Sequence, residues 1–452
     1  MAGAELLRSR RKAAESQVTE TAAITDLDHE GRGVAHVDGK VVFIDDALPG
    51  ERVEWRRVKS TRTFDEGRLL NVLEASPHRV RPECPHFGVC GGCVLQHLSS
   101  QQQIEFKERQ LLDALTRIGN VTARSILPPL QGPAWHYRRR ARLAARWVPK
   151  KGKTVVGFRE RSSAFIANLE QCSILVEPVA RLIEPLSMLV TELSLRARVP
   201  QIEVAVADRV TALVIRVLDE PTAHDRALLE AFQRTHGVEI YLQPGGYETV
   251  APLTPPASRL EYRLPKFDVT VRFAPTDFVQ VNEALNVLMI ERAIEWLRPA
   301  ANEHVLDLFC GLGNFSLPIA RSGAQVTAVE GEAGLVARAR ENAALNGLAN
   351  VEFHVADLFS EDIAQAVWAK RSYDKVLLDP PRAGAREVLP LLAASGAQRI
   401  VYVSCHPGTL ARDAGVLVNE LGFELDAAGV MDMFPHTAHV ESMAVFTRRG
   451  KK

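Results

Sequence analysis

The sequence predicts a protein of mixed α/β and β class, with a C-terminal Rossmann-like α/β domain, a central α/β domain and a small N-terminal β-barrel. Three observations predict it. Short strands separated by glycine turns fill the first 75 residues, alternating apolar segments follow to about residue 270, and strands then alternate with helices. A chain of 452 residues is also too long for one ordinary core.

These patterns divide the chain into four segments. Residues 1–15 are a charged, basic tail that is expected to be disordered or loosely helical. Residues 16–75 contain five short strands and are expected to form the barrel. Residues 76–270 form the central domain, with several cysteines and a basic segment. Residues 271–452 form the Rossmann-like domain, on which a helix near 101–120 is expected to pack.

The composition is that of a soluble globular protein, with 46% apolar and 24% charged residues. No apolar run approaches the length of a membrane span, and no apolar stretch follows the basic N-terminus as it would in a secretory signal. We therefore expect a cytoplasmic protein that does not contact membranes. The formal net charge is zero, so the overall charge predicts no partner.

The distribution of charge is more informative. The segment from Arg138 to Lys153 carries eight Arg and Lys residues and no acid, with Trp135, Tyr137 and Trp147 in or beside it. Basic side chains neutralise phosphates and aromatic rings stack on bases, so this segment predicts nucleic-acid binding. A basic surface hairpin without a ligand is the alternative.

Four of the six cysteines have the spacing of metal ligands. Cys84, Cys90 and Cys93 lie close together, and Cys172 follows at a distance. In a cytoplasmic protein such thiols are more often ligands than disulfide partners. Zinc ribbons use two Cys-x2-Cys pairs, whereas this chain has one, so an iron–sulfur cluster fits better than zinc.

A glycine loop, Leu306-Asp-Leu-Phe-Cys-Gly-Leu-Gly-Asn314, follows a predicted strand. Glu330 ends the next strand, where an acid can accept both ribose hydroxyls of a nucleotide. The loop lacks the three-glycine spacing of dinucleotide-binding proteins and nothing in it is built to hold a pyrophosphate. S-adenosylmethionine has no phosphate and fits better, with Asp357 at the end of the third strand placed to meet the adenine. Cys310, inside the loop, is expected to be structural.

Two later strand ends carry reactive groups. Asp379 begins an Asp-Pro-Pro-Arg segment, which amino-methyltransferases also use, and Cys405 ends the following strand. A thiolate that adds to C6 of uracil makes C5 nucleophilic enough to accept a methyl group. The thiol needs a lowered pKa or a nearby base, and a helix that starts after Cys405 is expected to help. Glu441, which opens the last strand, is the expected base for the C5 proton, with His436 and His439 as competitors.

These motifs resemble those of the bacterial RNA 5-methyluridine methyltransferases, from about residue 16 to the end. The likeness rests on Asp307-Leu-Phe-Cys-Gly-Leu-Gly-Asn-Phe, Leu378-Asp-Pro-Pro-Arg, Val403-Ser-Cys-His-Pro and His439-Val-Glu-Ser. The N-terminal barrel is similar to a TRAM domain. The resemblance implies Cys405 as nucleophile and Glu441 as base, and a cofactor and uracil site lined by Gln280, Phe309, Asn314, Glu330, Asp357 and Asp379.

The resemblance also implies that Cys84, Cys90, Cys93 and Cys172 hold a [4Fe-4S] cluster. Within the family, the tRNA enzyme lacks both the barrel and the cysteines, so their joint presence implies 23S rRNA as the partner, at uridine 1939. A monomer without an obligatory protein partner is expected. The alternatives are methylation of another rRNA or tRNA uridine, an N-methyltransferase, and a non-catalytic iron–sulfur RNA-binding protein. Two positions depart from the family pattern, His406 and Asp357, where asparagine is frequent.

Overall fold

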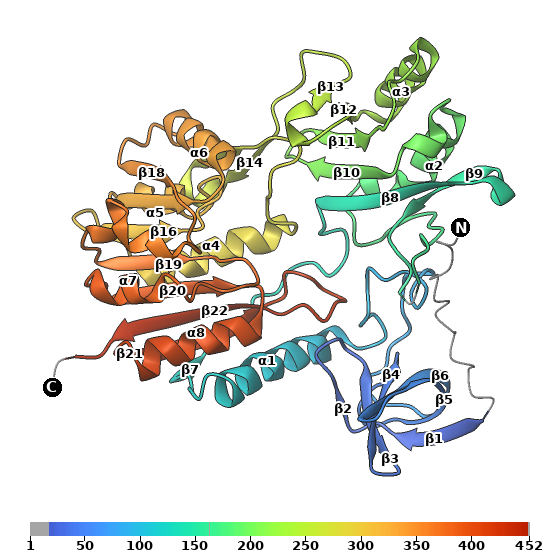
Figure 1. Ribbon diagram of the computed structural model, residues 1–452, viewed down its shortest axis with the longest axis horizontal. Helices are drawn as coiled ribbons and strands as arrows, with labels where there is room; N and C mark the ends of the chain where they lie inside the picture. Colours follow the sequence, from blue (N-terminus) through green and yellow to red (C-terminus); the bar gives the residue numbers. More distant parts are fainter. Residues whose placement is uncertain (1–17, 162, 451–452) are drawn as a thin grey trace, which may run out of the picture. The chain divides into compact units, whose positions relative to one another are not determined.

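The structure is a computed structural model that describes residues 18–161 and 163–450, in two compact units. The first unit contains the N-terminal residues to 88, together with 93–103 and 436–438. The second contains 89–92, 104–435 and the remaining C-terminal residues. The predicted tail, residues 1–15, lies outside the described residues. Figure 1 shows the elements of both units along the chain.

A six-stranded barrel forms the first unit. Its strand order is β1-β5-β6-β4-β3-β2, and the two outer strands of that order follow each other directly along the chain. Between them, the N–H of Ile24 donates to Glu51 O and the N–H of Thr25 donates to Val34 O, which joins the two ends of the sheet. The strands are β1 (Thr19–Ala23), β2 (Asp26–Leu27), β3 (Gly33–Val37), β4 (Lys40–Asp45), β5 (Arg52–Ser60) and β6 (Phe64–Glu74).

The sequence predicts five of these strands close to their observed bounds, and this part of the prediction is confirmed. Alternate residues, among them Val42, Ile44, Val53 and Trp55, fill the barrel core, and this alternation made the strands recognisable. Strand β2 was missed because two residues are too few to show a period.

A second six-stranded sheet, of order β13-β12-β11-β10-β8-β9, lies in the second unit. Leu143, Ile202 and Ile215 pair across β8, β10 and β11 and are fully buried. Their neighbours in sequence point to the opposite face, which stays partly open. Helices α2 and α3 pack along β9 and β12. The elements are β8 (Arg140–Val148), β9 (Lys153–Gly157), α2 (Ile183–Glu192), β10 (Gln201–Val206), β11 (Thr211–Arg216), α3 (Ala223–His236), β12 (Glu239–Gln243) and β13 (Ala251–Pro252).

An eight-stranded sheet carries the C-terminal α/β region, with strand order β18-β17-β16-β19-β20-β22-β21-β7. Strands β16 to β20 are parallel, and β22 enters antiparallel between β20 and β21. The chain runs outward from β16 in one direction and then resumes at β19 on its other side, which creates a topological switch point. The strands are β7 (Ser125–Ile126), β16 (His304–Leu308), β17 (Gln325–Glu330), β18 (Val351–Val355), β19 (Lys375–Leu378), β20 (Arg399–Ser404), β21 (Phe423–Met431) and β22 (Glu441–Arg448).

Helices cover both faces of this sheet, as Figure 1 shows. Val305, Leu377 and Val401 face a core shared with α4, α5 and α6, whereas the alternate residues Leu306 and Tyr402 face a core shared with α1, α7 and α8. This is the doubly wound arrangement that the alternating strands and helices predict. The helices are α4 (Glu283–Leu297), α5 (Ser316–Arg321), α6 (Ala333–Leu345), α7 (Leu389–Ala394) and α8 (Pro407–Asn419), and β14 (Glu261–Leu264) and β15 (Val269–Arg272) form a separate hairpin.

Helix α1 (Ser100–Arg117) corresponds to the helix that the sequence predicts near 101–120. Leu111 and Leu115 pack into the core that contains residues of α8. The chain after α1 passes so close to α8 that a Cβ on Gly119 would lie 2.4 Å from the carbonyl oxygen of Ala411, so glycine is required there. Among the described residues, no helix is both long and apolar enough to cross a membrane.

Lys107 on α1 is fully buried and forms the main polar link between this helix and the segment after β21. Its Nζ donates to Asp432 Oδ1 at 2.5 Å and to Phe434 O at 2.9 Å. Burial lowers the pKa of Lys107, and the charge of Asp432 opposes that effect. The link therefore holds the segment that leads into β22.

Replacing Lys107 with Met should destabilise the protein by about 3–5 kcal/mol, because the Asp432 carboxylate loses its buried partner. The measurement is urea unfolding. Arg117→Met on the same helix is the matched control, since Arg117 pairs with Asp113 on the surface and should contribute about 1 kcal/mol or less. Equal losses of unfolding free energy in the two variants would show that the bond between Lys107 and Asp432 does not stabilise the protein.

Candidate active site

The predicted site residues lie at neighbouring strand ends of the eight-stranded sheet. The parallel strands all end at the same edge, and β22 begins there because it runs antiparallel to β20. In an open α/β sheet this edge is the usual place for a ligand. In the order of the strands from β18 to β22, the residues at this edge are Asp357, Glu330, Phe309, Asp379, Cys405 and Glu441.

Strand register brings Cys405 next to Glu441. Ser404 pairs with Ser442, so the residue after Ser404 and the residue before Ser442 occupy the following pair of positions. The Ser442 hydroxyl donates to Ser404 O at 3.4 Å and supports this end of the ladder. Both Cys405 and Glu441 are half-buried. The sequence could not show this pairing, because 36 positions separate the two residues (441 − 405).

Burial dominates the electrostatics of this edge. It raises the pKa of the Cys405 thiol to about 11, with the charges of Glu441 and Asp379 adding to the effect and Arg382 opposing it. Burial also raises the pKa of Glu441 to about 8, assisted by Asp379, and the pKa of Asp379 to about 7. Two carboxyl groups and one thiol in a desolvated space each disfavour the charged form of the others.

The expectation that the helix after Cys405 lowers the thiol pKa is therefore wrong for the unliganded site. Helix α8 does begin at Pro407, but desolvation and two nearby acids outweigh its N-terminal dipole. His406, the residue that departs from the family pattern, is the N-cap of this helix. Its Nδ1 accepts the N–H of Thr409 at 3.2 Å. Asparagine is also a good N-cap, so His406 keeps a capping role that either residue can fill.

The two histidines considered as bases have other contacts. His436 belongs to the first unit, where its N–H donates to Gln103 Oε1 at 2.8 Å and its carbonyl accepts the N–H groups of Val94 and Leu95. The Nδ1 atom of His439 lies 3.4 Å from Arg382 Nη2, and partial desolvation of the imidazole together with the Arg382 charge lowers the pKa of His439. Glu441 therefore stays the candidate base, because among the three it is the one whose charge raises the pKa of the Cys405 thiol.

The glycine loop opens beside Asp379. The N–H of Asp379 donates to Leu308 O at 3.4 Å, at the switch point between β16 and β19. Phe309 follows Leu308 with φ +63°, a left-handed conformation that is rare for an aromatic residue and concentrates at functional sites. Its ring contacts Phe359, with centroids 5.8 Å apart. Gly311 has φ +54° and open space where a Cβ would be, so the loop leaves room for a ligand.

Glu330 is held by three backbone groups. Its carboxylate accepts the N–H of Gly311 at 3.2 Å, of Gly331 at 2.7 Å and of Glu332 at 3.1 Å. Such contacts fix a carboxylate at the mouth of the loop, as binding of ribose hydroxyls requires. Asp357 lies at the next strand end and is exposed, and its Oδ1 accepts the N–H of Phe359.

Asn314 makes hydrogen bonds within the protein, and Gln280 is partly buried. Asn314 Oδ1 accepts the Tyr262 hydroxyl at 2.8 Å, and its amide exchanges hydrogen bonds with Asn286 on α4. Gln280 is half-buried in the segment before α4. Its neighbours in sequence, Val279 and Val281, share a core with Leu312 of the glycine loop. Asn314 thus makes hydrogen bonds that stabilise the loop, and the contact of Gln280 with the cofactor stays a prediction.

Asp307 was not among the predicted site residues, although it is the last residue but one of β16. It is buried, its Oδ2 accepts the Ser316 hydroxyl, and its Oδ1 has no hydrogen-bond partner among the described residues. Burial raises the pKa of Asp307 to about 7. A buried carboxyl oxygen without a partner, beneath an open glycine loop, fits a site for a ligand with cationic or hydroxyl groups. S-adenosylmethionine has both.

Two further residues were missed. The charge of Arg382 lowers the pKa of Cys405 and so opposes the nearby acids, and its place in the Asp-Pro-Pro-Arg motif could have indicated it. The charge of Lys107 also acts on Glu441 and lowers its pKa. One lysine on an amphipathic helix gives no sequence signal, because it has the appearance of a surface residue.

The four predicted metal ligands are divided between the units. Cys84 and Cys93 belong to the first, and Cys90 and Cys172 to the second. None of them is in a disulfide. In the described parts of the chain, no group of three or more Cys, His, Asp or Glu side chains is placed to hold a metal ion. Four thiols are the donor set that an iron–sulfur cluster requires.

The basic segment differs from its prediction. Arg139 is buried in an ion pair with Glu283 at 2.5 Å, and Arg140 donates to Pro275 O. Tyr137 is buried, with its hydroxyl donating to Pro435 O, and Arg196 covers the ring of Trp147. Arg139 and Arg140 therefore help to fix the packing of the second unit, and nucleic-acid binding by the rest of this segment stays a prediction.

Curated relatives resemble nearly the whole chain. The protein named 23S rRNA (uracil(1939)-C(5))-methyltransferase RlmD from Xanthomonas axonopodis pv. citri is 53% identical over 94% of this chain and 97% of its own. Proteins of the same name from Methylococcus capsulatus and Stenotrophomonas maltophilia are each 53% identical over 94% of this chain and 96% of their own.

A solved structure supports the fold. The Pyrococcus abyssi tRNA (uracil-54, C5)-methyltransferase in complex with S-adenosyl-L-homocysteine superposes with a TM-score of 0.73 at 24% identity, over 94% of this chain and 99% of that one. Residues 18–70 match the TRAM domain, and residues 100–449 match the model described as tRNA (Uracil-5-)-methyltransferase. The chain therefore belongs to the tRNA (Uracil-5-)-methyltransferase family and carries a TRAM domain at its N-terminal end.

Proposed function

We propose that this enzyme methylates C5 of a uridine in 23S rRNA, at position 1939, with S-adenosylmethionine as methyl donor. The observation that carries the chemistry is the strand register that sets the Cys405 thiol beside the Glu441 carboxyl group, next to Asp379. The choice of RNA and of nucleotide rests on the curated relatives. Ribosomal RNA lies in the bacterial cytoplasm, so the enzyme is proposed to act there.

Cys405 is the proposed nucleophile. Its thiol first gives its proton to a carboxylate. Asp379 is the proposed acceptor, because its charge acts on the thiol and Glu441 must stay ionised for the later step. The sulfur then forms a bond to C6 of uracil, and the electron pair of the C5–C6 double bond moves toward C5 and O4. Asp379 lies at the adjacent strand end, where its carboxyl group is placed to hydrogen-bond the ring. Bound S-adenosylmethionine supplies the methyl group that C5 receives.

Glu441 is the proposed base for the second half of the reaction. After methylation, C5 carries both a proton and the methyl group. Glu441 accepts that proton, the C5–C6 double bond forms again, and the bond from C6 to the Cys405 sulfur breaks. A carboxylate with a pKa near 8 is a stronger proton acceptor than an ordinary glutamate, and near neutral pH enough of it is ionised to act.

Gln280, Phe309, Glu330 and Asp357 are the proposed cofactor contacts, with Asn314 supporting the loop. The backbone bonds that orient Glu330, the open space at Gly311 and the unpartnered oxygen of Asp307 support this assignment. An N-methyltransferase would also use an Asp-Pro-Pro segment, but it would have no use for a thiol and a second acid at the next two strand ends.

We also propose that Cys84, Cys90, Cys93 and Cys172 bind a [4Fe-4S] cluster. All four are outside disulfides, and the N–H of Gly92 points to Cys90 Sγ at 3.4 Å, a type of bond that tunes iron–sulfur ligands. The cluster would join segments of the chain that are distant in sequence. The monomeric state stays a prediction.

Glu441→Gln should trap a covalent complex between the enzyme and 23S rRNA, because the methylated adduct cannot lose its C5 proton. Product release should fall by about 100-fold or more. The complex is detected by denaturing electrophoresis with labelled S-adenosylmethionine and an rRNA fragment that contains uridine 1939. Cys405→Ala is the control. It should form neither product nor adduct and should still bind S-adenosylmethionine within about twofold of wild type.

Normal turnover by Glu441→Gln without an adduct would assign the base role to another group. Methylation of tRNA or 16S rRNA in place of 23S rRNA would leave the chemistry intact and contradict the proposed substrate.

Protein purified without oxygen should contain about four iron and four sulfide ions per chain and absorb broadly in the visible range. Serine in place of Cys84 or Cys172 should remove most of the iron, because each is a proposed ligand. Cys310→Ser is the matched control and should keep it, since Cys310 lies in the glycine loop. Stoichiometric zinc without iron would overturn the proposal.

A further inference from the structure

A groove of about 910 Å³ lies on the open face of the central sheet, away from the strand ends that carry Cys405 and Glu441. Its floor is one row of register partners that crosses five strands. Gly157, Ala144, Gln201, Arg216 and Gln243 follow one another from β9 through β8, β10 and β11 to β12. Since each pair is in register, the four side chains of this row point to the same face, and Gly157 adds none.

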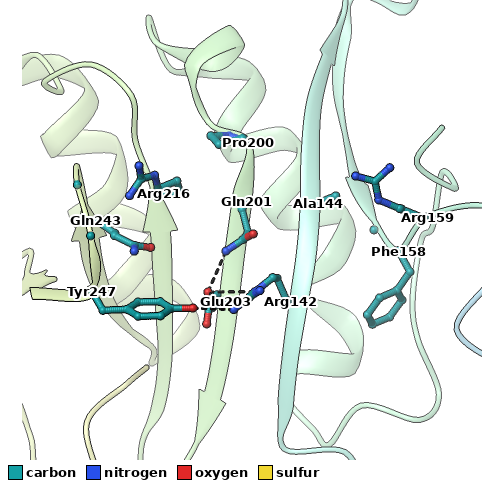
Figure 2. Close-up of a pocket in the computed structure, with 13 residues that line it drawn as sticks. Arg142, Ala144, Phe158, Arg159, Pro200, Gln201, Glu203, Arg216, Gln243 and Tyr247 are labelled. Atoms are coloured by element: carbon teal, nitrogen blue, oxygen red, sulfur yellow. Dashed lines mark hydrogen bonds and ion pairs between the residues drawn. The ribbon is translucent and has the colours of Figure 1, made fainter. Parts of the chain in front are cut away.

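The small residues at one end of this row leave the groove deep. Gly157 and Ala144 contribute almost no side chain, and Phe158 and Arg159 form the wall beyond them. Tyr247, with the glycine pair before it, forms the opposite wall and is 55% exposed. Figure 2 shows Arg216 and Arg159 on opposite sides of Gln201, with the Tyr247 ring pointing toward Glu203 and Arg142.

The groove is basic. Three arginines and one glutamate line it, which gives a net charge of +2 (3 − 1). Glu203 is already neutralised, since Arg142 Nη2 lies 3.0 Å from its Oε1 and the Gln201 amide donates to the same oxygen at 2.9 Å. Arg159 and Arg216 form no ion pair or side-chain hydrogen bond with any described residue, and Figure 2 shows both without a dashed contact.

A further polar group lines the groove. Gln243 is 6% exposed as a whole residue, and its side-chain amide lies at the groove surface. An amide at this position can donate to and accept from a ligand. The Tyr247 hydroxyl accepts from Arg142 Nη2 at 2.9 Å, which holds the ring in place beside this amide.

We propose that this groove binds a single-stranded segment of the RNA substrate, at nucleotides other than the one that is methylated. Arg159 and Arg216 contact phosphates, a base stacks on Tyr247, and the amides of Gln243 and Gln201 bond to a base edge. The volume lies in the range of about 300–1,000 Å³ typical of small-ligand pockets, which is enough for a nucleotide. The inference rests on the proposed function, because RNA is the polyanion that this enzyme must hold.

The chemistry favours RNA over a free small anion. Arg216 ends β11, and Arg159 follows the end of β9 by two residues. Three strand spacings separate β11 from β9, which corresponds to roughly 10–15 Å. One phosphate group cannot meet both, whereas a chain of nucleotides presents several. Contact at a second place would orient the RNA, since the active site itself receives only one flipped uridine.

The test compares Arg159→Ala/Arg216→Ala with the matched control Arg234→Ala, which removes an exposed arginine from α3. Binding to an rRNA fragment that contains uridine 1939 is measured against salt concentration. The double variant should bind about tenfold or more weakly, and its salt slope should fall by about 1.4, or 0.7 for each lost contact with a single strand. The single-turnover rate at saturating RNA and the affinity for S-adenosylmethionine should stay within about twofold, as for the control.

A second readout needs no turnover. A photo-reactive benzoylphenylalanine in place of Tyr247 should crosslink to the rRNA at one or two positions other than the methylated uridine. The proposal is overturned if the double variant keeps wild-type affinity and salt slope, if no crosslink forms, or if uridine monophosphate binds the groove as tightly as the rRNA fragment does. If the wild-type enzyme does not methylate 23S rRNA at all, the proposed substrate is wrong. The crosslinking result with that RNA then shows separately whether the groove binds RNA.

Discussion

The chemistry depends on one backbone constraint, the antiparallel pairing of β22 with β20. A fully parallel sheet would end every strand at this edge and could supply only the residues that follow strands. Because β22 runs the other way, it begins where β20 ends, and Ser442 pairs with Ser404. Glu441 therefore lies beside Cys405, and a base and a nucleophile from distant parts of the chain share one desolvated position.

Desolvation then sets the reactivity of this position. It raises the pKa values of the Cys405 thiol and of both neighbouring carboxyl groups, so all three groups hold their protons more tightly than in water. A more exposed glutamate would have a lower pKa and would be a weaker base. A more exposed thiol would also have a lower pKa and would ionise more readily. The buried Lys107 and the adjacent Arg382 moderate the negative charge, and Lys107 also fixes the segment that leads into β22.

Much of this arrangement was accessible from sequence because strand-end motifs are local. Asp307, Glu330, Asp379 and Cys405 each follow a short apolar run, and the common edge of a parallel sheet brings such positions together. Register across β20 and β22, the direction of the thiol pKa shift and the burial of Arg139 were not accessible. Each depends on contacts between segments far apart in the chain, and a charged residue in a sequence gives no sign of whether a partner buries it.

The central claim is that Cys405 forms a covalent bond with the target uridine. The most direct test uses an rRNA fragment in which 5-fluorouridine replaces uridine 1939, with S-adenosylmethionine present. Fluorine at C5 cannot leave as a proton does, so the reaction should stop at a methylated adduct. Mass spectrometry after digestion should find that adduct on the peptide that contains Cys405. An adduct on Cys310, or normal release of unmodified enzyme with no adduct, would contradict the account.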